Sequence, residues 1–172
     1  MEAEIVDQTF EPFLVQAFEA AIASLDQSRV QEGTQIKQVL LDYVAVLTQS
    51  IQELQAFVGV FEQEYRQRFE AKLNEWLGSQ VDETRLLTEM AILLEKGDIH
   101  EELDRLDIHI DKLHQLLDET EPVGRELDFL IQEMNREVNT IGSKSSPIEI
   151  KNSVVQMKTT LEKIREQIQN VE

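Results

Sequence analysis

Apolar residues recur every three or four positions along nearly the whole of this 172-residue sequence, and that spacing constrains the fold more than any other feature. Side chains three or four positions apart lie on one face of an α-helix. Only six glycines and three prolines interrupt the pattern, and no segment alternates apolar and polar residues for long enough to predict a strand. The sequence therefore predicts an all-α protein that is long enough to bury a real core.

The first half of the sequence predicts one long helical arm. Residues 1–8 are acidic and aperiodic, as expected of a linker remnant, and the arm occupies residues 9–78. Gly33 is the position at which we expect the arm to kink or end. Two interleaved heptad series follow it, namely Leu40, Leu47, Leu54 and Phe61, and Val44, Ile51, Val58 and Tyr65. Heptads are typical of coiled coils, so we expect a coiled-coil-like arm or hairpin.

Residues 79–172 predict a C-terminal domain of shorter helices, because breaks typical of helix ends divide its apolar seams. The expected helices follow Asp82, Asp98, Pro122 and Ser146. We expect Asp98 and Glu101 to form a capping box, and Gly142 to end the third helix. At the start of the last helix, Ser146 is the expected cap and Pro147 the first helical residue. These shorter helices are expected to form a bundle.

The composition indicates the cellular compartment in which we expect the protein. The sequence has no cysteine, which excludes disulfides and thiolate metal sites and favours a reducing compartment. It has no basic segment followed by an apolar export signal, and no uncharged apolar run long enough to cross a membrane. We therefore expect a cytoplasmic protein without a membrane partner.

The net charge of −18 argues against general attraction to nucleic acid, because such binding needs clustered lysine and arginine. The charge is unevenly distributed, however. Between Pro122 and Lys158, five acidic residues balance five basic residues, so this window is neutral. Its first part, Pro122 to Lys144, also has the densest set of polar functional groups in the chain. A functional site is expected there first.

Two polar stripes border the apolar seams of this region. In the helix after Asp98, one stripe consists of Glu102, Arg105, His109 and Lys112 at helical spacing. In the next helix, Glu126, Glu133 and Glu137 follow one flank, and Arg125, Asp128, Gln132, Asn135 and Asn139 follow the other. Packing the first stripe against this helix would bring Glu102 and His109 towards either its carboxylates or its arginine.

Four residues of these stripes are candidate metal ligands: Glu102, His109, Glu133 and Glu137. Carboxylate oxygens with an imidazole suit Mn²⁺ or Mg²⁺, and such an ion activates water against a phosphodiester. Two alternatives stay open. His109 is more commonly a boundary histidine hydrogen-bonded to Glu102 or another neighbour, and the glutamates have an ordinary interpretation as a solvated acidic flank.

Several neighbouring residues are candidate contacts to phosphate. Guanidinium groups match phosphate oxygens, so Arg125 and Arg136 qualify, although salt bridges to nearby glutamates are equally expected. Lys144 lies in an expected turn from which its side chain can reach a phosphate. Asn135 and Asn139 are poor helix formers among good ones, which indicates either a function or hydrogen bonds between helices.

Several of these segments together resemble the C-terminal domain of the YicC-like endoribonuclease family. The resemblance is carried by DIHEELDRL from Asp98, His109, GRELDFLIQEMNREVNTI from Gly124, Ser143 and Lys144, and IREQIQNVE at the end. Arg29, Glu32, Gly33, Asp82, Glu83, Arg85 and Leu86 also fit the family pattern. The similarity extends over the chain from about Phe13 onward. Glu126 departs from it at a position that is commonly basic in the family.

The resemblance implies an endoribonuclease that depends on Mn²⁺ or Mg²⁺, prefers single-stranded RNA and assembles into a ring-shaped hexamer. On this hypothesis Glu102, His109, Glu133 and Glu137 hold the ion, and His109, Glu133 and Glu137 act in catalysis. The RNA backbone is then bound by Arg105, Arg125, Arg136, Asn135, Asn139 and Lys144. Family members carry a separate N-terminal domain, so we expect this sequence to represent the C-terminal part.

Two other functions compete with RNA hydrolysis. In the first, the heptads between Leu40 and Tyr65 build a homo-oligomer, and the chain serves as an assembly module without chemistry of its own. In the second, the chain is an acidic all-α adaptor that binds a helix of another protein. Neither alternative needs Glu102 and His109 to approach the carboxylates of the next helix.

Overall fold

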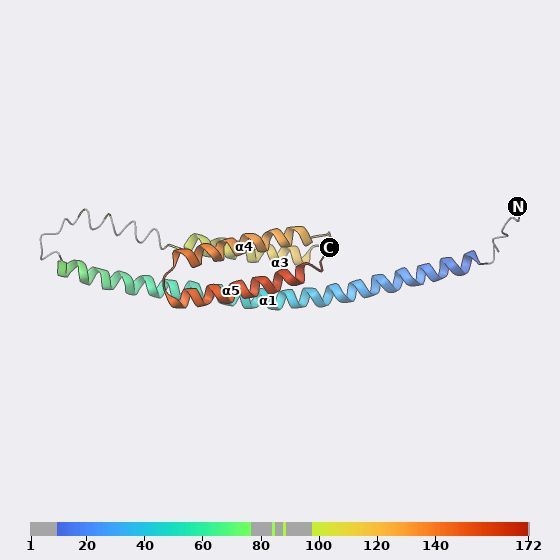
Figure 1. Cartoon of the computed structure of the whole chain (residues 1–172), viewed down its shortest axis with the longest axis horizontal. Helices are drawn as coiled ribbons and strands as arrows, with labels where there is room; N and C mark the ends of the chain where they lie inside the picture. The colour runs from blue at the N-terminus through green and yellow to red at the C-terminus, as the bar shows by residue number, and fades with distance from the viewer. Residues whose placement is uncertain (1–9, 77–83, 85–87, 89–97, 172) are drawn as a thin grey trace. The chain divides into compact units, whose positions relative to one another are not determined.

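A computed structural model describes residues 10–76, 84, 88 and 98–171, and these residues contain four long helices and no strand (Figure 1). The helices are α1 (Glu11–Trp76), α3 (His100–Asp118), α4 (Gly124–Lys144) and α5 (Ile148–Ile168). The all-α prediction is confirmed, as is the order of one long helix followed by shorter ones. The predicted linker at residues 1–8 lies outside the described residues, and so does the predicted helix after Asp82 except for Thr84 and Thr88, which are helical.

The chain divides into two units, Met1–Val39 and Leu40–Glu172, and α1 contributes to both. In the first unit, α1 carries large apolar side chains that are mostly exposed. They include Phe10, Phe13, Leu14, Phe18, Ile22 and Leu25. Among the described residues, no side chain before Leu40 is buried. The first unit therefore contributes an apolar helical surface rather than a core.

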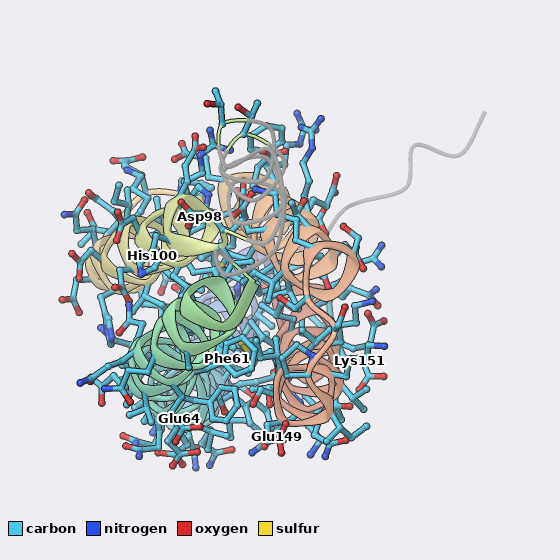
Figure 2. The ribbon with its side chains drawn as sticks, turned by 90° about the vertical axis from the view of Figure 1, so that its left-hand side faces the viewer. Phe61, Glu64, Asp98, His100, Glu149 and Lys151 are labelled. Carbon is cyan, nitrogen blue, oxygen red and sulfur yellow. The ribbon has the colours of Figure 1, made fainter. Side chains whose placement is uncertain are left out.

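The second unit is a four-helix bundle in which α4 packs against both α3 and α5. The later part of α1 completes it: Gln55 of α1 donates a hydrogen bond to Asp107 of α3 over 2.7 Å, and Lys163 of α5 lies over the ring of Tyr43 of α1. Figure 2 looks along the bundle and shows Phe61 of α1 near the starts of α3 and α5. α3 and α5 therefore start at the same end of the bundle, and α4 runs in the opposite direction (Figure 1).

The heptad seam of α1 is part of the bundle core. Its buried members are Leu40, Val44, Leu47, Ile51, Leu54 and Val58. From the other helices, fully buried side chains such as Leu106, Leu127, Met134 and Leu161 fill the same core. The apolar side chains of the heptad seam are thus buried within one chain, because α3, α4 and α5 of the same chain cover them.

Three expected helix boundaries are wrong in detail. α1 continues through Gly33, because one glycine costs only about 1 kcal/mol in a helix of good helix formers. α4 continues past Gly142, where a Cβ atom would lie 3.1 Å from Cγ1 of Val154, so this glycine lets α4 approach α5 closely. α5 begins at Ile148, one residue later than expected, and no side chain caps it.

The capping box expected at the start of α3 forms only in part. Asp98 accepts a hydrogen bond from the backbone N–H of His100 over 2.9 Å, which satisfies one free donor of the first turn. Glu101, however, pairs with Arg105 one turn later instead of reaching back to Asp98. The side chain of Glu101 therefore supports the exposed face of α3.

By length and composition alone, one stretch among the described residues, Glu11–Phe61, could cross a membrane. Its most apolar window is 33% buried inside the protein, and core helices of globular proteins meet the same criterion. The stretch is therefore weak evidence for a membrane span.

Candidate functional site

Two buried glutamates lie where α3 faces α4, and each is paired with a cation from the opposite helix. Glu102 and Glu137 are both 5% exposed. Lys144 Nζ, at the end of α4, donates to Glu102 Oε1 over 2.7 Å. Arg105 Nη1, from α3, lies 3.4 Å from Glu137 Oε1. The polar stripe of α3 thus meets the glutamate flank of α4, a choice between the two flanks that the sequence left open.

Each cation of these pairs also has a second partner. Lys144 Nζ donates to the backbone carbonyl of Asp98 over 3.0 Å, and Arg105 also pairs with Glu101. A charged group that is buried needs such compensation, because desolvation penalises an isolated charge. Arg105 and Lys144 therefore neutralise and position carboxylates of the α3–α4 interface.

One oxygen of Glu102 has no hydrogen-bond partner among the described residues. Oε1 accepts from Lys144, whereas Oε2 is buried and unpaired. Ser145 Oγ, next to Lys144 in sequence, is also buried and unpaired. Buried polar atoms in native proteins are nearly always hydrogen-bonded to protein or water. Glu102 Oε2 therefore has an unused acceptor site for water, a donor group or a cation.

Hydrogen bonds shift the pKa of two groups at this end of the bundle. The bond to Glu102 raises the pKa of Lys144 above its ordinary value of 10.5, against the opposing effect of desolvation. The backbone N–H of His100 lowers the pKa of Asp98 below its ordinary value of 3.8, and the His100 side chain adds to this effect. Both groups therefore keep their charge over the physiological range.

His109 and Glu133 occupy the next turn along the same interface. The antiparallel register that pairs Arg105 with Glu137 places His109 opposite Glu133, four residues farther along α3 and four residues back along α4. His109 is half-buried, and the Glu133 side chain is 33% exposed. Among the described residues, Glu133 has a single long contact, 3.8 Å, with Arg136. This turn is more open to solvent than the two buried pairs.

The remaining candidate residues do not all lie on this interface. Asp128, on the flank that also carries Asn135 and Asn139, lies 3.6 Å from Arg165 of α5, so this flank borders α5 rather than α3. Arg136 projects into solvent between the two flanks and is paired only weakly. The structure therefore brings Glu102, Arg105, Glu137 and Lys144 together and leaves the two asparagines on the far side of α4.

No three histidine, aspartate or glutamate side chains form a metal-binding group within the parts of the chain that the structure describes. Lys144 and Arg105 already neutralise Glu102 and Glu137, but Glu133, His109 and Glu102 Oε2 still offer ligand atoms. Mg²⁺ typically binds through one or two carboxylates and keeps waters or substrate phosphates as its other ligands. The residues present fit that mode and do not form an all-protein cage.

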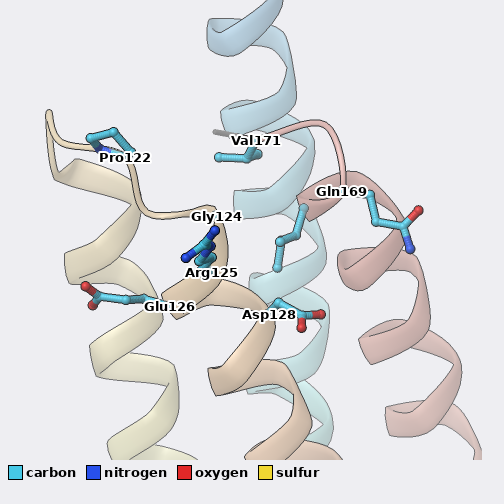
Figure 3. A pocket seen from close by; sticks show the side chains of 8 residues that line it. Pro122, Gly124, Arg125, Glu126, Asp128, Gln169 and Val171 are labelled. Atoms are coloured by element: carbon cyan, nitrogen blue, oxygen red, sulfur yellow. The ribbon is translucent and has the colours of Figure 1, made fainter.

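Arg125 marks a hollow at the other end of the bundle (Figure 3). The hollow has a volume of about 970 Å³, lies between the start of α4 and the end of α5, and is lined by Pro122, Gly124, Arg125, Glu126, Asp128, Ile168, Gln169 and Val171. In the described residues, Arg125 makes no ion pair, so the alternative of a salt bridge to a nearby glutamate does not hold for this arginine. Its guanidinium is available to an external anion.

Sequence reasoning overlooked Phe129. This side chain is 64% exposed and lines a second groove, of about 380 Å³, together with Lys112, Leu116, Arg125, Glu126 and Leu130. The signal was present in the sequence, because Phe129 falls outside the apolar seam of α4, one turn after Arg125. An aromatic residue on the polar side of an amphipathic helix indicates a contact surface.

Comparison with known proteins places these helices in a family. Residues 54–172 match the family described as "Endoribonuclease YicC-like, C-terminal". The chain is 43% identical over 161 residues to the "Probable endoribonuclease YicC" of Clostridioides difficile strain 630, and 38% identical over 164 residues to the protein of that name in Haemophilus influenzae. These matches cover 92% of this chain and 55% of each relative, so the chain spans about half the length of both. The chain belongs to the YicC-like endoribonuclease family.

Proposed function

We propose that this chain forms part of an endoribonuclease that hydrolyses phosphodiester bonds in single-stranded RNA with Mn²⁺ or Mg²⁺. One observation carries the proposal: α3 and α4 bring Glu102, Glu137 and their cations to one interface, with His109 and Glu133 in the next turn. The names of the two relatives support RNA as the substrate. The proposal concerns the whole protein, and the cytoplasm is its proposed place of action.

In the proposed mechanism, Glu133 and His109 would hold the ion at the open turn of the interface. Glu137 lies one turn farther along α4, and Glu102 lies two turns back along α3. A bound divalent ion supplies a water of lowered pKa and neutralises charge on the scissile phosphate. Arg105 and Lys144 pair with Glu137 and Glu102 and hold these carboxylates in place. The imidazole of His109 has one free lone pair, so it would serve either as a ligand of the ion or as the base that accepts a proton from the attacking water. Arg136 and Arg125 orient the RNA backbone from the exposed face of α4.

The test is cleavage of a labelled single-stranded RNA with Mn²⁺ by the Glu133→Gln variant. This change keeps the size of the side chain and removes its charge, and we expect the rate to fall by roughly 100-fold or more. Glu166→Gln, on the exposed surface of α5, is the control and should retain the full rate. A wild-type rate for Glu133→Gln would show that Glu133 has no part in the reaction.

Glu137→Gln and Glu102→Gln extend this test to the two buried carboxylates. Because each change also removes an ion pair, the thermal unfolding temperature of each variant has to be measured alongside its cleavage rate. Loss of cleavage in a variant that unfolds at the wild-type temperature would assign the carboxylate to the chemistry. Loss of cleavage only together with loss of folding would assign it to the scaffold.

We also propose homo-oligomer assembly, through a surface different from the one that the heptads predicted. The Leu40–Val58 seam is buried within the chain, but Phe13 and Phe18 are each 69% exposed on α1. Phe10, Leu14, Ile22 and Leu25 extend the same apolar surface at helical spacing. An apolar helical face of this length is typical of protein–protein interfaces.

Sedimentation equilibrium tests this assembly. The double variant Phe13→Glu and Phe18→Glu should shift the protein towards the monomer, because each glutamate would have to be buried at the interface. Val155→Glu, an equally accessible position on α5, is the control and should leave the oligomer intact. A wild-type protein that stays monomeric at high concentration would contradict the assembly proposal.

A further inference from the structure

We propose that Phe129 stacks on an unpaired RNA base while Lys112, Arg125 and Arg136 hold the flanking phosphates. The inference rests on the proposed function, because it takes RNA as the ligand. It adds a binding position outside the carboxylate interface and a physical basis for preferring single strands. The proposed occupant is a single-stranded segment of RNA.

The groove beside Phe129 has the shape that a base needs. Leu116 and Leu130 are buried at 3% and 7% exposure and form its floor, and the exposed ring of Phe129 forms one wall. Its volume of about 380 Å³ lies in the range of small-ligand sites, roughly 300–1,000 Å³. An apolar floor with one accessible aromatic face suits a flat, partly apolar ring system.

The charges around Phe129 suit a polyanion. Lys112 of α3 and Arg125 of α4 line the groove, and neither makes an ion pair within the residues that the structure describes. Arg125, Phe129 and Arg136 are separated by four and seven residues, so they follow one exposed stripe of α4. Glu126 is the opposing charge at this site. Two cations against one carboxylate give the groove a local excess of positive charge on a chain of net charge −18, and Arg136 lies farther along the stripe, 3.8 Å from Glu133.

This combination favours single-stranded RNA over a protein partner. Nucleic acid supplies a phosphate on either side of each base, so one ligand satisfies the aromatic ring and the cations together. An apolar helix docked over Phe129 would instead leave Lys112 and Arg125 without anionic partners at the interface. A duplex hides its base faces in the stack and cannot present one to Phe129.

The position of Phe129 connects binding to cleavage. Phe129 precedes Glu133 by four residues, which is just over one helical turn, or about 6 Å along α4. Arg125 also lines the larger hollow at the start of α4, so the groove and that hollow share one cation. A strand held through Phe129 would therefore run along α4 and bring a neighbouring phosphate towards Glu133.

The experiment measures binding of labelled oligoadenylate of about 12 nucleotides at low salt, without divalent ions so that no cleavage occurs. Phe129→Ala should weaken binding by roughly tenfold or more, because stacking on one aromatic contributes that much. Phe129→Trp should bind at least as tightly as the wild type, and its added tryptophan fluorescence should be quenched by the RNA. Val155→Ala is the control, because Val155 is also 64% exposed but lies on α5.

The salt dependence of RNA binding gives a second measurement, on variants of the cations. A variant that merely failed to fold would not show the expected change in this salt dependence. Each of Lys112→Ala and Arg125→Ala should lower the slope of log affinity against log salt by about 0.7, the contribution of one phosphate contact on a single strand. Glu126→Lys should tighten binding and steepen the same slope. A matched RNA duplex should bind more weakly than the single strand and should not respond to Phe129→Ala.

Wild-type affinity in Phe129→Ala would overturn the inference, and so would a wild-type chain that binds no single-stranded RNA. A change in sedimentation without a change in RNA binding would assign the groove to a protein contact instead. The two proposals fail separately. Cleavage that is lost in Glu133→Gln but unaffected by Phe129→Ala would retain the nuclease and reject the stacking site. RNA binding that depends on Phe129, without any cleavage, would retain the stacking site and reject the nuclease.

Discussion

Lys144 Nζ and Glu102 Oε1 lie 2.7 Å apart and join the last residue of α4 to the first turn of α3. Glu102 is buried, so Lys144 determines whether its charge is compensated. Lys144→Met should lower the free energy of unfolding by about 2–3 kcal/mol, because it leaves a buried carboxylate without its cation. Urea denaturation measures the change.

The double variant Lys144→Met with Glu102→Leu provides the matching control. Removing both charges removes the cost of an unpaired buried group, so it should regain most of the stability that Lys144→Met loses. If Lys144→Met alone unfolds at the wild-type urea concentration, the pair contributes nothing to stability and the role given to Lys144 is wrong.

The free energy of unfolding should depend on the ionisation of Asp98 at acidic pH and on the ionisation of Lys144 at alkaline pH. The pKa of Asp98 is lowered in the folded state, so its contribution is present above its ordinary pKa of 3.8 and is lost as the pH falls below it. The pKa of Lys144 is raised, so its contribution is present below 10.5 and is lost as the pH rises further. Unfolding curves of wild type and Lys144→Met should therefore converge above about pH 10.5. A constant difference between them through that range would contradict this assignment.

Two glycines in helices of the bundle should respond oppositely to alanine. Gly59 has open space around it, so Gly59→Ala should stabilise the protein by about 0.5–1 kcal/mol through helix propensity. At Gly142 the new Cβ would lie 3.1 Å from Val154, so Gly142→Ala should destabilise by roughly 1 kcal/mol. Thermal unfolding gives both values. Adding Val154→Ala should reduce the penalty at Gly142, and equal effects at the two glycines would contradict the close approach of α4 and α5.

Substitution of Leu47 tests whether the heptad seam is buried within one chain or between chains. Its side chain is fully buried, so Leu47→Ala should lower the free energy of unfolding by about 2–5 kcal/mol. Val46 lies on the exposed side of the same helix, so Val46→Ala should lower it by less than about 0.5 kcal/mol. Because the seam packs within the chain, the Leu47 penalty should not depend on protein concentration. A penalty that disappears on dilution would show that Leu47 lies between chains instead.

The periodicity of the sequence predicted the helices and a polar stripe of α3 at the contact with α4, but neither the flank of α4 that this stripe faces nor the ion pairs between the two helices. The spacing of Glu102, Arg105 and His109 indicated the side of α3 that meets α4, and Arg105 does contact Glu137 there. Which cation pairs with which carboxylate depends on the register between the helices, and local periodicity does not contain it.

The heptads from Leu40 and the side chain of Phe129 were interpreted less well, for different physical reasons. A seven-residue repeat has the same form whether its partner is another chain or a later helix of the same chain. An aromatic residue beside an apolar seam is easily counted as core, and only its 64% exposure separates Phe129 from that class. Whether Glu133 and His109 act in catalysis stays a prediction, because it depends on a bound ion and substrate.

The burial pattern of α1 allows its two parts to vary separately. Every buried side chain of the described residues lies at Leu40 or later, so amino-acid replacements earlier in α1 leave the packed interior of the protein untouched. Substitutions at positions such as Phe13 and Phe18 would therefore change the strength of the proposed self-association without altering the carboxylates on α3 and α4. The same separation would let an engineer exchange that region of the helix for another binding segment while retaining the bundle.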